Sequence, residues 1–392
     1  MRTTLITLLF IASSLYATSL EEIISKSLDS NPSLESITKR ISANKEDIEL
    51  SKQFANPELA FTKNSINSNQ AMSQTTISFK QKIPYFGKRD SAREIAEGEE
   101  NVLNVKLFRA KVALVGAIKK EAYKIWELKE LYSILQRYEV LTKQNIDLHE
   151  SYTSTENNQH MGIMSAELTL SDLKIQRTVL KAKIVSAYAR LSYLASFRVK
   201  DLDIALSIES KPSRVLLQKG LVNNPDVELK DKEILKQNAK VKLAKLNHKP
   251  DFSVLASYSN RVNFDDYVNL GFGVSLPIYG SEDMKEQKQR ELALSLNALK
   301  EDTNLAINSS FNVYFAQMMS DYKVYHIIKD EALPQVQHMF ELSNSSVSAG
   351  ADLFKYIDIL VQKLKLEQKS IKAVASYNIS KAEIEKLTGK LK

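Results

Sequence analysis

Hydrophobic residues recur along this chain with two different periods. Over most of its length the spacing is three or four residues, which is typical of an α-helix with one apolar face. Two such stretches are long, from Ser91 to about Ser154 and from Ser281 to about Val347, and Pro334 is expected to kink the second. In four short stretches apolar and polar residues alternate, as in β-strands. We predict these strands at about residues 57–63, 75–83, 250–260 and 267–277.

The pattern occurs twice. The residues that recur at a constant offset are Asn31 and Pro32 with Asn224 and Pro225, and Pro84 and Gly87 with Pro277 and Gly280. We therefore predict a first repeat over 19–205 and a second over 206–392. Each contains a helix, a β-hairpin and two long helices, joined by turns at Gly162 and Gly350. Proline cannot donate a hydrogen bond to a strand ladder, so each predicted second strand should end at Pro84 or Pro277. With Gly87 and Gly280, these prolines predict the exits from strand to helix.

The first residues are typical of an export signal. Arg2 precedes an apolar stretch from Leu5 to Leu15, and Ala17 is a small residue suited to cleavage, so we predict a signal peptide over 1–18. The apolar stretch is too short to cross about 30 Å of hydrocarbon as a helix. A buried N-terminal helix is the alternative. The mature chain is then expected either in the periplasm or inserted in a membrane through its strands.

The four predicted strands have a length and alternation that suit a tilted bilayer β-barrel. Aromatic residues lie at their ends, as at a membrane interface: Tyr85, Phe86, Tyr258, Tyr267 and Tyr279. Four strands cannot close a barrel, and an open edge is not viable in lipid. Three copies would supply about twelve strands. A small soluble sheet packed on a helix is the alternative.

Composition narrows the function classes. The chain has no cysteine, which excludes disulfides, thiolate metal sites, cysteine nucleophiles and a lipid on an N-terminal cysteine. Only 10 glycines and 8 prolines occur in 392 residues, which favours long helices. The formal net charge of +7 comes from interleaved Lys and Glu, so solvated helix faces are favoured over nucleic-acid binding.

Signals for catalysis are weak. The five histidines form no His-x-x-x-His pair and no cluster with carboxylates at metal-ligand spacing. Met161 and Met164 could offer thioethers to a soft metal, but packing or turn positions are the favoured interpretation. We expect no enzyme activity, no cofactor and no resident metal.

Several short motifs resemble the TolC family of outer-membrane efflux proteins. They are, in chain order, residues 28–32 (LDSNP), 56–59 (NPEL), 81–89 (QKIPYFGKR), 276–280 (LPIYG), 333–335 (LPQ) and the Gly350 turn. The resemblance covers about residues 20–390 and includes the duplication. It implies a mainly α-helical fold with a transmembrane β section. A homotrimer would form a 12-stranded β-barrel in the outer membrane and an α-barrel in the periplasm.

The resemblance also implies a function. The chain would be the outer-membrane channel of a tripartite efflux system in a Gram-negative envelope, a passive export duct with a large periplasmic portion. Its partners would be a periplasmic adaptor, an inner-membrane pump of the resistance-nodulation-division type, and outer-membrane lipid. Residues 81–89 are similar to members that export heavy metals. Some relatives carry a lipid on an N-terminal cysteine, which this chain lacks. A soluble periplasmic coiled-coil scaffold or adaptor is the alternative.

Two groups of residues acquire expected roles from the resemblance. Gly162 and Gly350 would lie at the periplasmic tip, where an adaptor docks, although glycine also suits a turn in its own right. Asp352 and Asp358 would line a constricted pore, where threefold symmetry makes each a ring that attracts cations and gates the pore. If this helix end lines the closed pore, Tyr356 adds a bulky ring to the gate. Asp352 also suits a helix N-terminus, and Asp358 lies one position short of the commoner family spacing.

Overall fold

The computed structural model describes residues 18–65, 70, 73–152, 157–347 and 353–391. Nearly all of the predicted signal peptide therefore lies outside the described residues. The chain forms two compact units, one made of Met1–Pro32, Lys111–Val222 and Ser309–Lys392 and the other of Ser33–Ala110 and Asn223–Asn308. Each unit takes segments from both sequence repeats, so the units and the repeats divide the chain differently.

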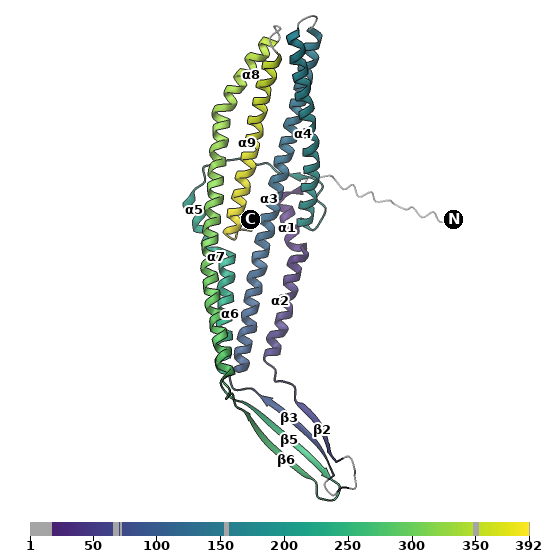
Figure 1. The fold of residues 1–392 in the computed structure, drawn as a ribbon, viewed down its shortest axis with the longest axis vertical. Helices are drawn as coiled ribbons and strands as arrows, with labels where there is room; N and C mark the ends of the chain where they lie inside the picture. The colour runs from purple at the N-terminus through teal and green to yellow at the C-terminus, as the bar shows by residue number, and fades with distance from the viewer. Residues whose placement is uncertain (1–17, 66–69, 71–72, 153–156, 348–352, 392) are drawn as a thin grey trace, which may run out of the picture. The chain divides into compact units, whose positions relative to one another are not determined.

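The second unit contains a four-stranded antiparallel sheet (Figure 1). Its strands, in spatial order, are β2 (Glu58–Asn64), β3 (Gln74–Ile83), β5 (Asp251–Arg261) and β6 (Tyr267–Ser275). All four lie within about two residues of the predicted ranges. The hairpins of the two repeats join through β3 and β5, with Phe79 opposite Ala256. The strands β2 and β6 are the edges of this sheet.

Helices of the same unit flank the hairpins in sequence. They are α2 (Pro32–Ser51), α6 (Pro225–Leu246) and the first parts of α3 (Lys88–Tyr152) and α7 (Ser281–His326). Proline begins α2 and α6, where its missing N–H costs nothing. The Asn224 side chain caps α6 by accepting the N–H groups of Asp226 at 2.8 Å and Val227 at 3.2 Å.

The first unit is built from long helices. Its elements are β1 (Thr18–Ser19), α1 (Leu20–Ser30), the rest of α3, α4 (Asn157–Ala195), β4 (Leu202–Asp203), α5 (Arg214–Lys219), the rest of α7, α8 (Leu333–Val347) and α9 (Leu353–Leu387). Buried residues on α3 recur every three or four positions, including Val112, Val115, Ile118 and Ala122. This spacing packs one face of α3 against its neighbours, as expected for a coiled coil. A short parallel pairing of β1 with β4 was not predicted.

Pro334 alters the hydrogen bonding of the helical residues that precede it. Residues Ile327–Ala332 are π-helical, and the N–H of Leu333 bonds the carbonyl of Ile328, five residues back. Pro334 follows at once, and its ring excludes the ordinary hydrogen bond to residue 330. The expected disturbance of this helix therefore takes the form of a π-helical segment.

None of the helices within the described ranges combines the length and the apolar character needed to cross a membrane.

Candidate functional site

One face of the sheet is apolar. Residues that pair directly across antiparallel strands lie on the same face, and the ladder brings together the apolar members of all four alternations. They are Leu59, Phe61, Ile77, Phe79, Phe252, Val254, Ala256, Tyr258, Val268, Leu270, Phe272 and Val274. The rings of Phe252 and Phe272 stack at 5.6 Å between centroids.

This apolar face is uncovered within the described chain. Leu270 is 82% exposed, Leu59 76% and Phe61 70%, values unusual for large apolar side chains on a regular sheet. A contiguous exposed apolar patch marks a surface that meets another apolar phase. Lipid or another protein surface is therefore required to cover it.

The opposite face is polar. It carries hydroxyl, amide and charged groups, such as Thr62, Thr76, Lys80, Ser253, Ser257, Ser259 and Asn269. Two hydroxyls meet across strands, with Thr76 Oγ1 and Ser259 Oγ 2.8 Å apart. Lys82 Nζ lies 2.7 Å from a carboxylate oxygen of Glu58 on the neighbouring strand. The sheet is thus apolar on one side and hydrated on the other.

The predicted exit residues lie between strand and helix in both hairpins. Pro84 and Gly87 lie between β3 and α3, and Pro277 and Gly280 lie between β6 and α7. Gly87 has φ of +85° and Gly280 has φ of +72°, a region that residues with a Cβ rarely adopt. Glycine therefore permits the abrupt change of direction that starts each long helix.

An ion pair between the buried Lys88 and the half-exposed Asp251 holds the first exit. The Lys88 ammonium donates to Asp251 at 2.8 Å and to the carbonyl of Lys249 at 2.9 Å. The same Asp251 oxygen accepts the N–H of Tyr85 at 2.8 Å. Sequence reasoning missed this junction. Its only local signals are a lysine directly after Gly87 and an aspartate at the start of a strand.

The structure corrects the expectation for the first turn between long helices. The sequence predicts Gly162 in that turn, but α4 begins at Asn157, so Gly162 lies inside the helix. It is buried, and a Cβ added to it would lie 3.2 Å from the Cβ of Leu353 on α9. The glycine therefore permits the close approach of α4 and α9. Gly350 and Asp352 lie outside the described residues.

Tyr356 does not line an open surface. Its side chain is buried, its ring centroid lies 5.3 Å from that of Phe340, and its hydroxyl accepts a hydrogen bond from Asn145 at 3.1 Å. Burial raises the pKa of the Tyr356 hydroxyl. Within the described chain the Tyr356 ring therefore packs inside the helical unit, and its place in a pore ring stays a prediction. Asp358 follows Tyr356 by two residues, so its side chain points about 200° away from Tyr356 around the axis of α9 and is exposed. Its carboxylate accepts a hydrogen bond from Gln362 at 2.8 Å.

The side chains that could ligate a metal form no site in the described chain. Among the described residues, no group of three or more His, Cys, Asp or Glu is placed to hold a metal ion. Met161 and Met164 are 69% and 67% exposed on α4, so they are not core residues within this chain. The sequence favours packing or turn positions for them; both lie within α4, and neither packs in the core of the described chain.

Comparison with known proteins identifies the fold. No protein-family model matches the sequence, and no curated protein is significantly similar to it. Solved structures match over nearly the whole chain. CusC matches with a TM-score of 0.79 and 13% identity, covering 96% of this chain and 95% of that chain. The open state of the Neisseria gonorrhoeae MtrE outer-membrane channel matches at 0.80 and 15%, covering 94% and 88%.

A third match is the outer-membrane protein VceC of Vibrio cholerae, with a TM-score of 0.77, 14% identity, and 95% of this chain and 97% of that chain covered. The fold is therefore that of outer-membrane channels of the TolC type. The fold expected from the sequence resemblance is confirmed. At these identities, similarity establishes the fold alone.

Proposed function

We propose that this chain is the outer-membrane channel of a tripartite efflux system and acts as a passive export duct. One observation carries the proposal: a sheet with an uncovered apolar face and a polar reverse, in a chain that has the fold of outer-membrane channels. The apolar face would contact outer-membrane lipid, and the polar face would line a water-filled lumen.

The edges of the sheet support a homotrimer. Backbone groups on the outer sides of β2 and β6 have no strand partner within the described chain. In lipid such groups must be paired, so β6 of one copy would bond β2 of the next. Three copies would close a 12-stranded barrel, and their long helices would form the periplasmic α-barrel.

The ends of the two helical hairpins are the proposed docking sites for partner proteins. The ends near Gly162 and Gly350 would dock a periplasmic adaptor, which in turn would join an inner-membrane pump of the resistance-nodulation-division type. Heavy-metal cations are the cargo that the similarity of residues 81–89 favours. In that segment, Lys88 binds Asp251 and the Arg89 guanidinium lies 3.9 Å from the ring centre of Phe54. Both of these basic side chains are thus engaged within the chain, where they hold the strand exit. We therefore assign the selection of cargo to the pump rather than to these residues.

Cell fractionation and conductance test the proposal together. We expect the protein to require detergent for release from outer membranes, to begin after the predicted signal peptide, and to form ion-conducting pores in planar bilayers. The alternative is a soluble periplasmic scaffold. Release with the periplasmic fraction without detergent, and no conductance, would establish that alternative and overturn the channel.

A further inference from the structure

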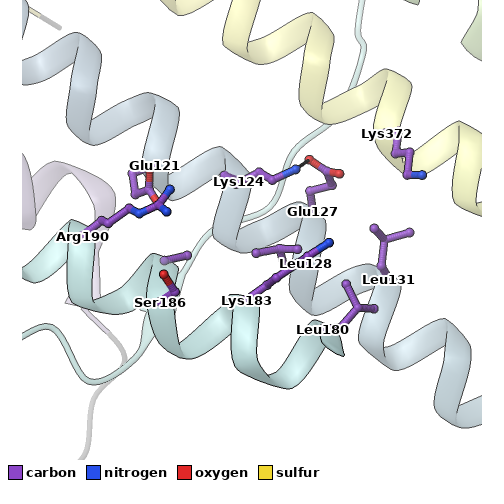
Figure 2. A pocket seen from close by; sticks show the side chains of 11 residues that line it. Glu121, Lys124, Glu127, Leu128, Leu131, Leu180, Lys183, Ser186, Arg190 and Lys372 are labelled. Carbon is purple, nitrogen blue, oxygen red and sulfur yellow. Dashed lines mark hydrogen bonds and ion pairs between the residues drawn. The ribbon is translucent and has the colours of Figure 1, made fainter. Parts of the chain in front are cut away.

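A cavity of about 480 Å³ lies between α3, α4 and α9 in the helical unit (Figure 2). Its floor is apolar and includes Leu128 and Leu131 from α3 and Leu180 from α4. A second hollow of about 230 Å³ shares Leu131, Leu180, Lys183 and Lys372 with the first. The shared lining makes the two hollows one continuous groove, and their combined size is that of a site for a small organic molecule.

The rim of the groove is cationic. Lys124 comes from α3, Lys183 and Arg190 from α4, and Lys372 from α9 (Figure 2). Lys124 is neutralised by Glu127 at 2.7 Å. In the described part of the chain, Lys183 and Lys372 make no hydrogen bond or ion pair with a neighbouring side chain. Two ammonium groups from different helices therefore border the same apolar floor without a counter-charge.

The two carboxyl groups of the lining, Glu121 and Glu127, offset only part of the charge of its four cationic side chains. Glu121 lies beside Arg190 at one end of the cavity (Figure 2). Its Oε1 atom is buried without a hydrogen-bond partner. Burial raises the pKa of Glu121, although the charges of Arg190, Lys124 and Lys120 act to lower it. The groove therefore favours a ligand that brings negative charge.

We propose that this groove binds a small amphipathic organic anion, with its apolar body on the leucine floor and its charged headgroup between Lys183 and Lys372. A hydrated inorganic anion would leave the leucines exposed to water, and a neutral apolar molecule would leave the two lysines unmatched. The headgroup would bridge α4 and α9, so the bound molecule would hold these two helices together.

The test uses a pair of naphthalene probes that differ in charge. The full-length protein is placed in lipid nanodiscs and titrated with 8-anilinonaphthalene-1-sulfonate, with the signal of empty nanodiscs subtracted. N-phenyl-1-naphthylamine has the same apolar body without the sulfonate and serves as the neutral probe. We expect saturable binding of the sulfonate that weakens about tenfold in the Lys183→Gln/Lys372→Gln variant, because charge-assisted contacts are lost. Binding of the neutral probe should stay unchanged.

The matched control is Lys181→Gln/Lys369→Gln, which makes the same charge change at exposed lysines of the same two helices, outside the groove. This variant should bind the sulfonate like the original protein. Equal weakening in both double variants, equal weakening of both probes, or no saturable binding of the sulfonate would overturn the inference. Conductance measured on the same preparations keeps the outcomes separate, since a conducting protein without this binding refutes the groove alone.

Discussion

Two helical glycines contact their neighbours in different ways. At Gly162 an added Cβ would meet the Cβ of Leu353 at 3.2 Å, close to the backbone of α9. At Gly116 it would meet Cδ of Lys386 at 3.1 Å, in a flexible side chain that can move aside. The same residue type thus marks a close helix approach at one position and an adjustable contact at the other.

Alanine at these two positions should have different effects. We expect Gly116→Ala to stabilise the protein by about 0.5–1 kcal/mol, because alanine loses less backbone entropy in a helix. Gly162→Ala should gain little, and Gly162→Leu should destabilise by about 1–3 kcal/mol through overpacking. Thermal unfolding followed by circular dichroism measures both. Equal stabilisation by the two alanine variants would show that α4 and α9 do not meet closely at Gly162.

The stability of the folded protein should depend on pH through Glu121. Burial raises its folded-state pKa above the ordinary 4.5, so the folded protein holds this proton more tightly than the unfolded chain. Its contribution to stability is present below pH 4.5 and is lost as the pH rises through the folded pKa. We therefore expect Glu121→Gln to match the original protein near pH 4 and to exceed its melting temperature at neutral pH. A melting-temperature difference that is the same at both pH values would contradict this assignment.

At the scale of elements, the strands were predictable and some helix ends were not. Alternation fixes which residues of a strand share a face, so β5 and β6 follow from sequence. The end of a helix depends on tertiary contact, and the polar residues before Gly162 concealed the start of α4 at Asn157. The burial of Tyr356 had a readable signal. Leu353, Tyr356, Ile357 and Leu360 form a stripe at helical spacing, and all four are buried.

The two faces of β6 can be tested with neighbouring residues. Leu270 lies opposite Ala256 on the apolar face, and Asn269 lies opposite Ser257 on the polar face. On the lipid face a lysine near the bilayer midplane costs about 2–4 kcal/mol, whereas a lysine on the lumen side costs little. We expect Leu270→Lys to reduce the fraction of membrane-inserted assembly, and Asn269→Lys to leave it near the original level. Similar losses in gel-shift assays of purified membranes would refute the assignment of faces.

At the scale of the whole molecule, repeats and periodicity predicted the order of helices and hairpins, and the motif resemblance implied the channel fold. The pairing of distant segments had no signal of its own in the sequence. No local pattern indicates that β3 lies beside β5, because that pairing joins strands from different repeats. The ion pair of Lys88 with Asp251 also joins the two repeats, and no local pattern in the sequence indicates the pairing. Its partners are far apart in sequence, and neither stands out alone.

The number of copies is the first prediction for the assembled protein. Four strands per chain cannot close in lipid, so we expect a homotrimer in detergent. Mass photometry or native mass spectrometry measures the number directly. A stable monomer that inserts into membranes would contradict the prediction.

The candidate gate gives the second prediction at this scale. If Asp352 and Asp358 form like-charge rings, replacing both with Ala should change conductance and reduce cation preference in planar bilayers, without affecting assembly. Tyr356→Phe is the matched control, because the structure buries this ring and its hydroxyl bonds only within the chain. Unaltered conductance in the double Ala variant would remove both aspartates from the gate.

The two unpaired edges of the sheet have a consequence for biogenesis. If the proposed homotrimer forms, the edge strands of each chain are paired only by other copies, and the final state is reached through a bimolecular or higher-order encounter. The maturation rate of the chain should then depend on how much unassembled chain is present, unlike that of a protein that completes its sheet alone. Until the encounter occurs, the exposed edges and the apolar face are an aggregation hazard. With the proposed assembly, dilute expression would therefore lengthen the period during which the chain stays unassembled and exposed to aggregation.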